Sequence, residues 1–270
     1  MLLFSLLLSQ ATPAHATLHV GGSYIDVYYA TGGIWAESGN GLRVYNGGWR
    51  DVTWPGSPWN QITIEYTIGG TPYRYDGNYT SWTYSVTSEL DLSVGATNET
   101  YYRMEMVGLQ MEKVETWDDA QQGMLISLKV TNTSGSTISD FRVMHGIDPD
   151  QDYNSYGYFD TYNDVRADGL FASSSGIASG LTVGYGLCDP AKQDLGHTSD
   201  WQTDADAGFS DFGGGSGDYT MHVRHRESTI DPGATVNPQF VFLYDTNVTA
   251  ASTLYDTLGH DLCNPCGDDD

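Results

Sequence analysis

The chain of 270 residues carries 35 acidic and 11 basic side chains, a formal net charge of −24, and 17% of its residues are charged, against about 25% in typical soluble domains. This balance excludes a nucleic-acid-binding protein and disfavours binding to anionic membranes, because both need clustered Lys and Arg. Aromatic residues make up 13% of the chain, which is too apolar for a disordered acidic tail and enough for a sizeable core. After the N-terminal segment no stretch of 18 apolar residues occurs, so no integral membrane span is predicted.

Residues 1–16 are predicted to be a secretory signal peptide. The apolar residues 2–8 lead to Ala14-His15-Ala16, which fits a small-x-small cleavage pattern, although no Lys or Arg precedes the apolar run. A short buried helix is the alternative. The mature protein would start near Thr17, with one domain over 17–262 and an acidic, Cys-containing tail over 263–270, and would be secreted or displayed at the cell surface. Four N-x-S/T sequons agree with export: Asn78, Asn98, Asn132 and Asn247.

Strand patterns recur along the chain. Residues 61–69 alternate apolar and polar side chains, Gly69-Gly70 turns the chain, and Tyr73 and Tyr75 resume the alternation, which predicts a hairpin. Residues 124–130 and 138–144 form a second alternating pair around a polar turn. Further strands are predicted at 24–30, 42–45, 82–86, 101–106, 181–187, 219–225 and 236–244. One helix is predicted, over 248–258. The absence of alternating strands and helices therefore favours a large antiparallel two-sheet β-sandwich, supersandwich-like, with one short C-terminal helix; two packed sandwiches are the alternative.

Three cysteines are present, Cys188, Cys263 and Cys266, and an exported protein is expected to hold a disulfide. The bond could be a local Cys263–Cys266 bridge, or Cys188 could pair with either of the other two. A zinc site that adds His197 or His260 to the cysteines is a further alternative, although the spacing fits no standard zinc module.

The segment IDPDQDYNSYGYFDTYND predicts a calcium site. Asp148, Asp150 and Asp152 alternate, followed by Asn154, and in an irregular loop such side chains can converge on one hard cation. The segment resembles the Asp-x-Asp-x-Asp calcium loops of EF-hands and thrombospondin-type repeats, but Tyr153 and Phe159 replace the Gly and Glu of an EF-hand. The expected ligands are therefore Asp148, Asp150, Asp152, Asn154, and either Asp160 or Asp164. A solvated acidic turn is the alternative.

A second acidic region runs from 188 to 218 and contains seven Asp and a single basic residue, Lys192. It could fold over the first loop and share its ions, hold a second ion through Asp204 and Asp206, or be a mobile loop. His222, Arg224 and Arg226 share one face of a predicted strand and form a basic stripe, which could bind an acidic loop or a carboxylated sugar, or make ordinary internal salt bridges.

Two groups of residues suggest ligand chemistry. Trp49, Trp54 and Trp59 crowd one Pro-containing segment, where they could stack on sugar rings or cover the end of the core. His145 precedes the acidic loop, where it could act as a general base or be an ordinary sheet residue. No nucleophile elbow, zinc-protease or phosphate-loop motif is present.

The run of strands, together with VTNTSGSTISDFRV leading into DPDQD, resembles secreted bacterial β proteins of the galactose-mutarotase-like supersandwich type. The resemblance implies a fold; no catalytic residue of that family can be carried over. The sequence favours a secreted, calcium-stabilised β-sandwich that serves as a binding or cell-surface module, with glycans or further copies of itself as partners. A carbohydrate-active enzyme that uses His145 and a nearby Asp, and a surface-layer or filament subunit, are the alternatives.

Overall fold

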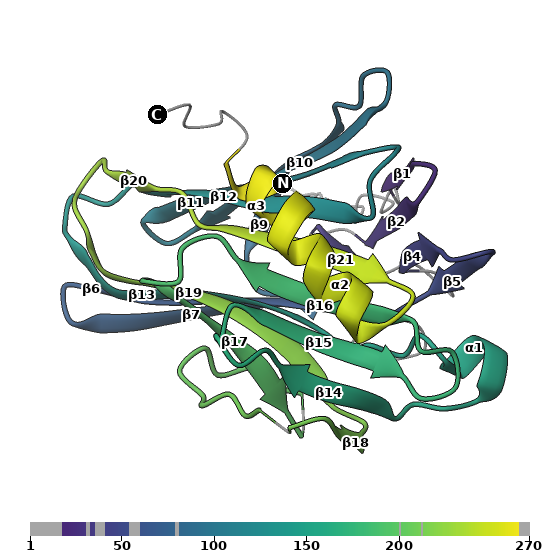
Figure 1. The fold of residues 1–270 in the computed structure, drawn as a ribbon. Coiled ribbons are helices and arrows are strands. Elements are labelled where there is room, and N and C mark those ends of the chain that lie inside the picture. Colours follow the sequence, from purple (N-terminus) through teal and green to yellow (C-terminus); the bar gives the residue numbers. More distant parts are fainter. Residues whose placement is uncertain are drawn as a thin grey trace, which may run out of the picture.

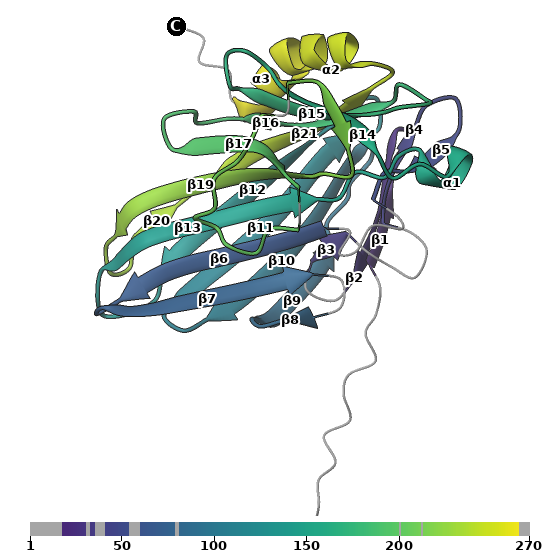
Figure 2. The same cartoon turned by 90° about the horizontal axis from the view of Figure 1, so that it is seen from below.

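The computed structural model describes residues 18–30, 33–35, 41–53, 60–78, 81–199, 201–211 and 213–264. The predicted signal peptide, Trp54, Trp59 and Cys266 lie outside these residues. Within them the chain is a set of antiparallel sheets in two main layers, as predicted, with a small sheet at one end (Figures 1 and 2). In the described part of the chain no helix is long and apolar enough to cross a membrane.

The larger main layer is a sheet of ten described strands. Its order is β18-β14-β15-β16-β21-β12-β11-β10-β9, and β20 pairs with β12. The strands span Ser85–Asp91 (β9), Thr97–Met106 (β10), Leu109–Asp118 (β11), Gly123–Asn132 (β12), Thr161–Val165 (β14), Phe171–Gly176 (β15), Thr182–Leu187 (β16), Gly215–Gly217 (β18), Thr235–Val236 (β20) and Gln239–Asp245 (β21).

The second main layer has six described strands in the order β17-β19-β13-β6-β7-β8. They span Asn60–Ile68 (β6), Thr71–Asn78 (β7), Ser81–Trp82 (β8), Ile138–Ile147 (β13), Gln193–Thr198 (β17) and Thr220–Ile230 (β19). The small sheet contains Leu18–Gly21 (β1), Ile25–Ala30 (β2), Ile34–Trp35 (β3), Leu42–Tyr45 (β4) and Trp49–Asp51 (β5). The hairpin predicted from residues 61–75 is confirmed as β6 and β7.

Apolar side chains from both main layers meet between the sheets and form the core. Strands β10 and β11 alternate strictly between buried and half-buried positions, as expected for strands with one face on a core. One pair of core positions is charged: Lys113 Nζ lies 2.8 Å from Glu115 Oε1, and both side chains are almost fully buried. Trp35 Nε1 also donates to this carboxylate, at 3.0 Å. The pair is therefore neutralised and hydrogen-bonded within the core, as buried charges must be.

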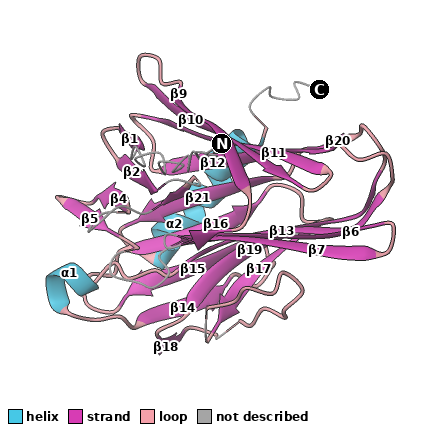
Figure 3. Cartoon of the chain, turned by 180° about the vertical axis from the view of Figure 1, so that it is seen from behind, coloured by secondary structure: helices cyan, strands magenta, loops and turns pink. Residues whose placement is uncertain are grey.

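The C-terminal helix covers the outer face of the ten-stranded sheet (Figures 2 and 3). It begins as α2 (Val248–Leu254), widens into a π-helical turn (Tyr255–Gly259) and ends as α3 (His260–Cys263). The wide turn coincides with Tyr255, whose hydroxyl donates to the Leu187 carbonyl at 2.7 Å and whose ring stacks on Phe171. A Cβ at position 259 would lie 2.6 Å from the Tyr255 ring, so glycine fits there.

A disulfide joins Cys188, after β16, to Cys263 in α3, which is one of the two long-range pairings left open by the sequence. The bond uses two of the three sulfurs that the alternative zinc site needed. It closes a loop of 75 residues, and restricting the unfolded chain in this way stabilises the fold by about 4 kcal/mol.

The outer face of the six-stranded sheet, which does not face the core, is partly covered by a loop of the same chain. Residues 201–211, which we call the strap, run across the outer side of β6 and β19. Trp201 Nε1 donates to Gln61 Oε1, and Arg74 donates to the Thr203 carbonyl. Positions on both faces of β6 are consequently buried, including Thr63, which the alternation predicted to face solvent.

Candidate functional site

Three carboxylates converge where β13 ends and β19 begins. Asp148 and Asp150 follow β13, and Asp218 precedes β19. Because Ile147 pairs with Met221 in the antiparallel ladder, these two strand ends lie side by side. One carboxylate oxygen from each of Asp148, Asp150 and Asp218 lies within 4.8 Å of the others. Asp150 is 1% exposed, whereas Asp218 is open to solvent, so the cluster has a buried base and an accessible side.

The charges of this cluster oppose one another. Partial desolvation raises the pKa of Asp218, and the nearby Asp160 carboxylate raises it further. Like charges held this close disfavour the ionised state of each carboxyl. A divalent cation between the oxygens would remove this repulsion, and an all-oxygen, irregular loop is the setting that calcium prefers.

The other predicted ligands lie differently. Asp152 is fully buried, and its Oδ2 accepts hydrogen bonds from the backbone N–H groups of Ala178 (2.6 Å) and Ser179 (3.1 Å). Asp152 thus fixes the turn between β15 and β16. Asn154 is exposed in the single-turn helix α1 (Tyr153–Tyr156). Of the five predicted ligands, the structure therefore brings Asp148 and Asp150 together, places Asp160 near their new partner Asp218, and directs Asp152 to the backbone.

The cluster's third member was absent from the predicted ligand set. Asp218 lies 68 residues after Asp150, in the second acidic region, and local spacing carries no information about so distant a partner. The signal that could have found it is the expectation that the second acidic region folds over the first loop, since Asp218 ends that region.

Exposed aromatic side chains gather beside the acidic loop. Tyr156 and Tyr158 are each 50% exposed, and Phe159 and Tyr162 nearly as much. Strand β5 lies at the same end of the molecule as α1 (Figure 1). There the Arg50 guanidinium carbon lies 5.7 Å from the centre of the Tyr156 ring, which ties β5 to α1. The loop that carries Asp150 and Asp160 therefore also carries a group of accessible rings.

Trp49 belongs to the same end of the molecule. It is 39% exposed on β5, lies edge-to-face with Tyr45 at 5.7 Å, and has the Arg43 guanidinium 5.3 Å from its ring centre. Of the three tryptophans predicted as ligand-binding, Trp49 is the one that the structure describes, and it is neither buried nor part of the core.

His145 lies inside the core between the two main layers. Its Nδ1 lies 2.6 Å from the Tyr185 hydroxyl, and its Nε2 lies 3.3 Å from Asn60 Nδ2. Burial lowers the pKa of His145 far below its usual value, and the nearby Lys113 lowers it further. The side chain is 1% exposed, so the geometry favours a structural role over the general-base role considered above.

The basic stripe of β19 is covered by the second acidic region. The Arg224 guanidinium bonds both carboxylate oxygens of Asp194 and donates to the carbonyls of Ala205 and Ala207 in the strap at 2.7 Å each. Arg226 lies 3.8 Å from Asp206. The basic stripe was expected to bind an acidic loop or a carboxylated sugar, or to make internal salt bridges. In the structure it makes internal salt bridges with an acidic segment of the same chain.

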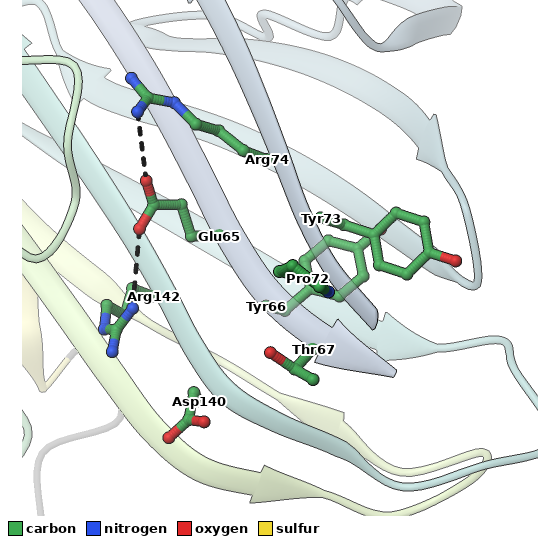
Figure 4. Close-up of a pocket in the computed structure, with 8 residues that line it drawn as sticks. All are labelled: Glu65, Tyr66, Thr67, Pro72, Tyr73, Arg74, Asp140 and Arg142. Carbon is green, nitrogen blue, oxygen red and sulfur yellow. Dashed lines mark ion pairs between the residues drawn. The ribbon is translucent and has the colours of Figure 1, made fainter. Parts of the chain in front are cut away.

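An open pocket of about 430 Å³ lies beside the strap (Figure 4). Glu65 stands between two guanidinium groups, those of Arg74 and Arg142, at 3.7 and 3.6 Å. The remaining lining residues come from β6, β7 and β13: Tyr66, Thr67, Pro72, Tyr73 and Asp140.

No family model matches the chain, and no curated protein matches its sequence. Among solved structures, a bacterial glucoamylase crystallised with acarbose has a TM-score of 0.51 at 10% identity, over 93% of this chain and 36% of the glucoamylase. A galactose mutarotase-related enzyme from Lactobacillus acidophilus has a TM-score of 0.43 at 11% identity, over 86% of this chain and 99% of the other. An α-galactosidase from Geobacillus stearothermophilus has a TM-score of 0.47 at 10% identity, over 89% of this chain and 42% of the other.

At these identities the likeness concerns the fold alone. The glucoamylase, whose TM-score exceeds 0.5, contains a region with a fold similar to that of this chain. The chain spans about a third of the glucoamylase and less than half of the α-galactosidase.

Proposed function

We propose that this protein is an exported β-sandwich domain that binds Ca²⁺ at Asp148, Asp150 and Asp218 and binds carbohydrate through the exposed aromatic side chains beside that site. The observation that carries the proposal is the convergence of three carboxylates, one of them buried, from two segments far apart in the sequence. Without a cation such a cluster would repel itself, and calcium tolerates its irregular geometry.

The calcium site and the aromatic rings belong to one loop. Asp150 anchors its beginning, Asp160 stands near Asp218 at its end, and Tyr156, Tyr158 and Phe159 lie between. A cation that joins Asp150 to Asp218 would hold both ends of the loop and so fix the positions of the rings. Fixing the rings before the ligand arrives lowers the entropy cost of binding.

The rings present accessible apolar faces bordered by hydroxyl and guanidinium groups. Such faces can stack on the C–H face of a sugar ring, while neighbouring polar groups bind its hydroxyls. Trp49 offers the largest ring and Tyr156 lies next to β5 through Arg50. These two residues are therefore the positions at which we expect carbohydrate to bind first.

Affinity electrophoresis in gels that contain soluble starch, galactan or xylan tests the proposal. We expect retardation by at least one polysaccharide in Ca²⁺, and a roughly tenfold weaker affinity, about 1.4 kcal/mol, for Trp49→Ala and for Tyr156→Ala. Leu92→Ala is the matched control, since Leu92 is an exposed apolar side chain on another part of the surface, 43% exposed. Unchanged retardation of both aromatic variants, or equal retardation in EDTA, would contradict the coupling of sugar binding to calcium.

A further inference from the structure

The pocket beside the strap has the chemistry of a second ligand site. Its volume of about 430 Å³ lies within the range of about 300–1,000 Å³ that small-molecule pockets occupy. The residues that line it come from the β6–β7 hairpin and from β13, and the charged side chains of Glu65, Arg74 and Arg142 meet on the outer face of this sheet (Figure 4). None of them belongs to the acidic cluster or to the aromatic end described above.

The charged groups of the pocket keep capacity for hydrogen bonds. Both guanidinium groups lie 3.6–3.7 Å from Glu65, which is beyond ordinary hydrogen-bond length. The Glu65 side chain is 15% exposed and accepts a hydrogen bond from the Ala205 N–H at 3.4 Å. Burial raises its pKa despite this hydrogen bond and the two guanidinium groups. A ligand that donates hydrogen bonds to Glu65 would therefore improve the solvation of a carboxylate that its neighbours satisfy only in part.

The backbone is distorted to place a second carboxylate in the pocket wall. Asp140 has a φ of +52° and is the one non-glycine residue in the described ranges with a positive φ. It lies in a bulge, since the register between β13 and β6 shifts between Ser139 and Arg142. Bulges re-aim side chains, and backbone strain of about 1–3 kcal/mol concentrates at functional positions. The Asp140 carboxylate is exposed, and no described side chain or backbone group hydrogen-bonds to it.

The strap holds the other wall in place. Arg74 donates to the Thr203 carbonyl, and Arg142 Nε lies 3.3 Å from Asp206. Arg74 Nε also donates to Asp76 at 3.0 Å, so contacts within the protein hold the whole guanidinium group of Arg74. Arg142 is held through its Nε and keeps hydrogen-bonding capacity for the pocket. The site is therefore preformed by contacts from three strands and one loop.

The lining selects a neutral, polyhydroxylated ligand. Glu65 and Asp140 would repel an anionic ligand, and Arg74 and Arg142 would repel a cationic one. The lining therefore favours neither charge. A hydroxyl group both donates and accepts, and adjacent hydroxyls on a ring match carboxylate acceptors that alternate with guanidinium donors.

We propose that this pocket binds one cyclic polyol, such as a single pyranose unit, independently of calcium. The inference adds a second site to the proposed carbohydrate binding and does not depend on the first. A single ring with few contacts is expected to bind with a Kd of about 1–10 mM.

Titration of the ¹⁵N-labelled full chain, followed by two-dimensional NMR, tests the proposal. The probes are methyl β-galactoside, methyl α-glucoside and myo-inositol, which separate sugars from other cyclic polyols, and glucuronate as the anionic comparison. We expect saturable shifts at the amides of residues 65–67, 73–74 and 140–142 with at least one neutral probe, equal in Ca²⁺ and in EDTA. Asp140→Asn should weaken this binding about tenfold.

The controls keep the outcomes distinct. Asp140→Asn preserves the backbone conformation, because Asn tolerates positive φ, and Arg103→Gln alters an exposed ion pair with Glu105 on β10, away from the pocket. Absence of saturable shifts at these amides, equal binding by Asp140→Asn and Arg103→Gln, or stronger binding of glucuronate would overturn the proposal. Shifts confined to Trp49 and residues 156–162 would overturn the pocket proposal while supporting the aromatic site. Shifts confined to the pocket would support the pocket proposal and contradict the aromatic site.

Discussion

Asp150 and Asp152 stand two residues apart, are both buried, and have different partners. Asp150 contributes to the carboxylate cluster, whereas Asp152 accepts two backbone hydrogen bonds from the β15–β16 turn. Alternate spacing alone predicted one role for both. The sequence could not separate them, because the groups that Asp152 binds lie 26 and 27 residues further along the chain.

This difference predicts opposite responses to substitution. Asp152→Ala should lower the free energy of unfolding by about 2–3 kcal/mol, since two buried backbone N–H groups lose a charged acceptor, and the loss should be the same with and without Ca²⁺. Asp150→Asn should instead abolish the stabilisation by Ca²⁺. Urea unfolding of both variants in Ca²⁺ and in EDTA measures this. The assignment fails if Asp152→Ala removes the calcium effect and Asp150→Asn retains it.

At the scale of elements, strands in which apolar and polar residues alternate could be predicted from the sequence. Strand β11 was not predicted. Its core-facing positions include Lys113 and Glu115, which interrupt the apolar alternation of Leu109, Met111 and Trp117. The two charges can occupy core positions because they pair with each other at 2.8 Å and Trp35 completes the hydrogen bonding. Such compensation arises from tertiary contacts and is invisible in the local sequence.

In the six-stranded sheet, the adjacent strands β17 and β19 bury histidines that stay neutral. Burial lowers the pKa of His197 in β17 to about 4 and that of His222 in β19 to about 3. The unfolded chain takes up a proton on each at about pH 6.5, whereas the folded chain does not, so stability falls as the pH drops below that value.

The resulting loss is about 1.4 kcal/mol per pH unit and per histidine, or about 2 kcal/mol for each between pH 7 and pH 5. Replacing His222 with Gln removes one proton uptake, so the difference in unfolding free energy between pH 7 and pH 5 should shrink by about 2 kcal/mol. Urea unfolding at the two pH values measures it. An unchanged difference in His222→Gln would show that His222 does not titrate on unfolding.

On the scale of the whole molecule, the two-layer fold, the hairpins and the C-terminal helix followed from periodicity and turn residues. The positions that complete the candidate site did not. Asp218 reaches the acidic loop because β13 and β19 are neighbours, and the pocket exists because a bulge at Asp140 faces the β6–β7 hairpin. Both depend on strand order, which a single sequence does not reveal.

Because acidic side chains are in excess, the stability of the fold depends on where the negative charges lie and which of them have basic partners. Two carboxylates of the second acidic region pair with arginines of β13 and β19: Asp194 with Arg224, and Asp206 with Arg142 and Arg226. No described arginine or lysine pairs with Asp218 in the same way. We therefore expect an external cation to change stability through the carboxylate cluster.

Thermal unfolding of the purified domain in Ca²⁺ and in EDTA, with Mg²⁺ as the comparison, tests this account most directly. At a Ca²⁺ concentration one hundred times the Kd, binding to the folded state stabilises it by about 2.7 kcal/mol, which raises Tm by about 5–10 °C in a chain of this size. We predict this rise for the native sequence, a smaller one with Mg²⁺, and none for Asp218→Asn. Superimposable melting curves in Ca²⁺ and EDTA, or an undiminished rise in Asp218→Asn, would contradict a calcium site formed by these three carboxylates.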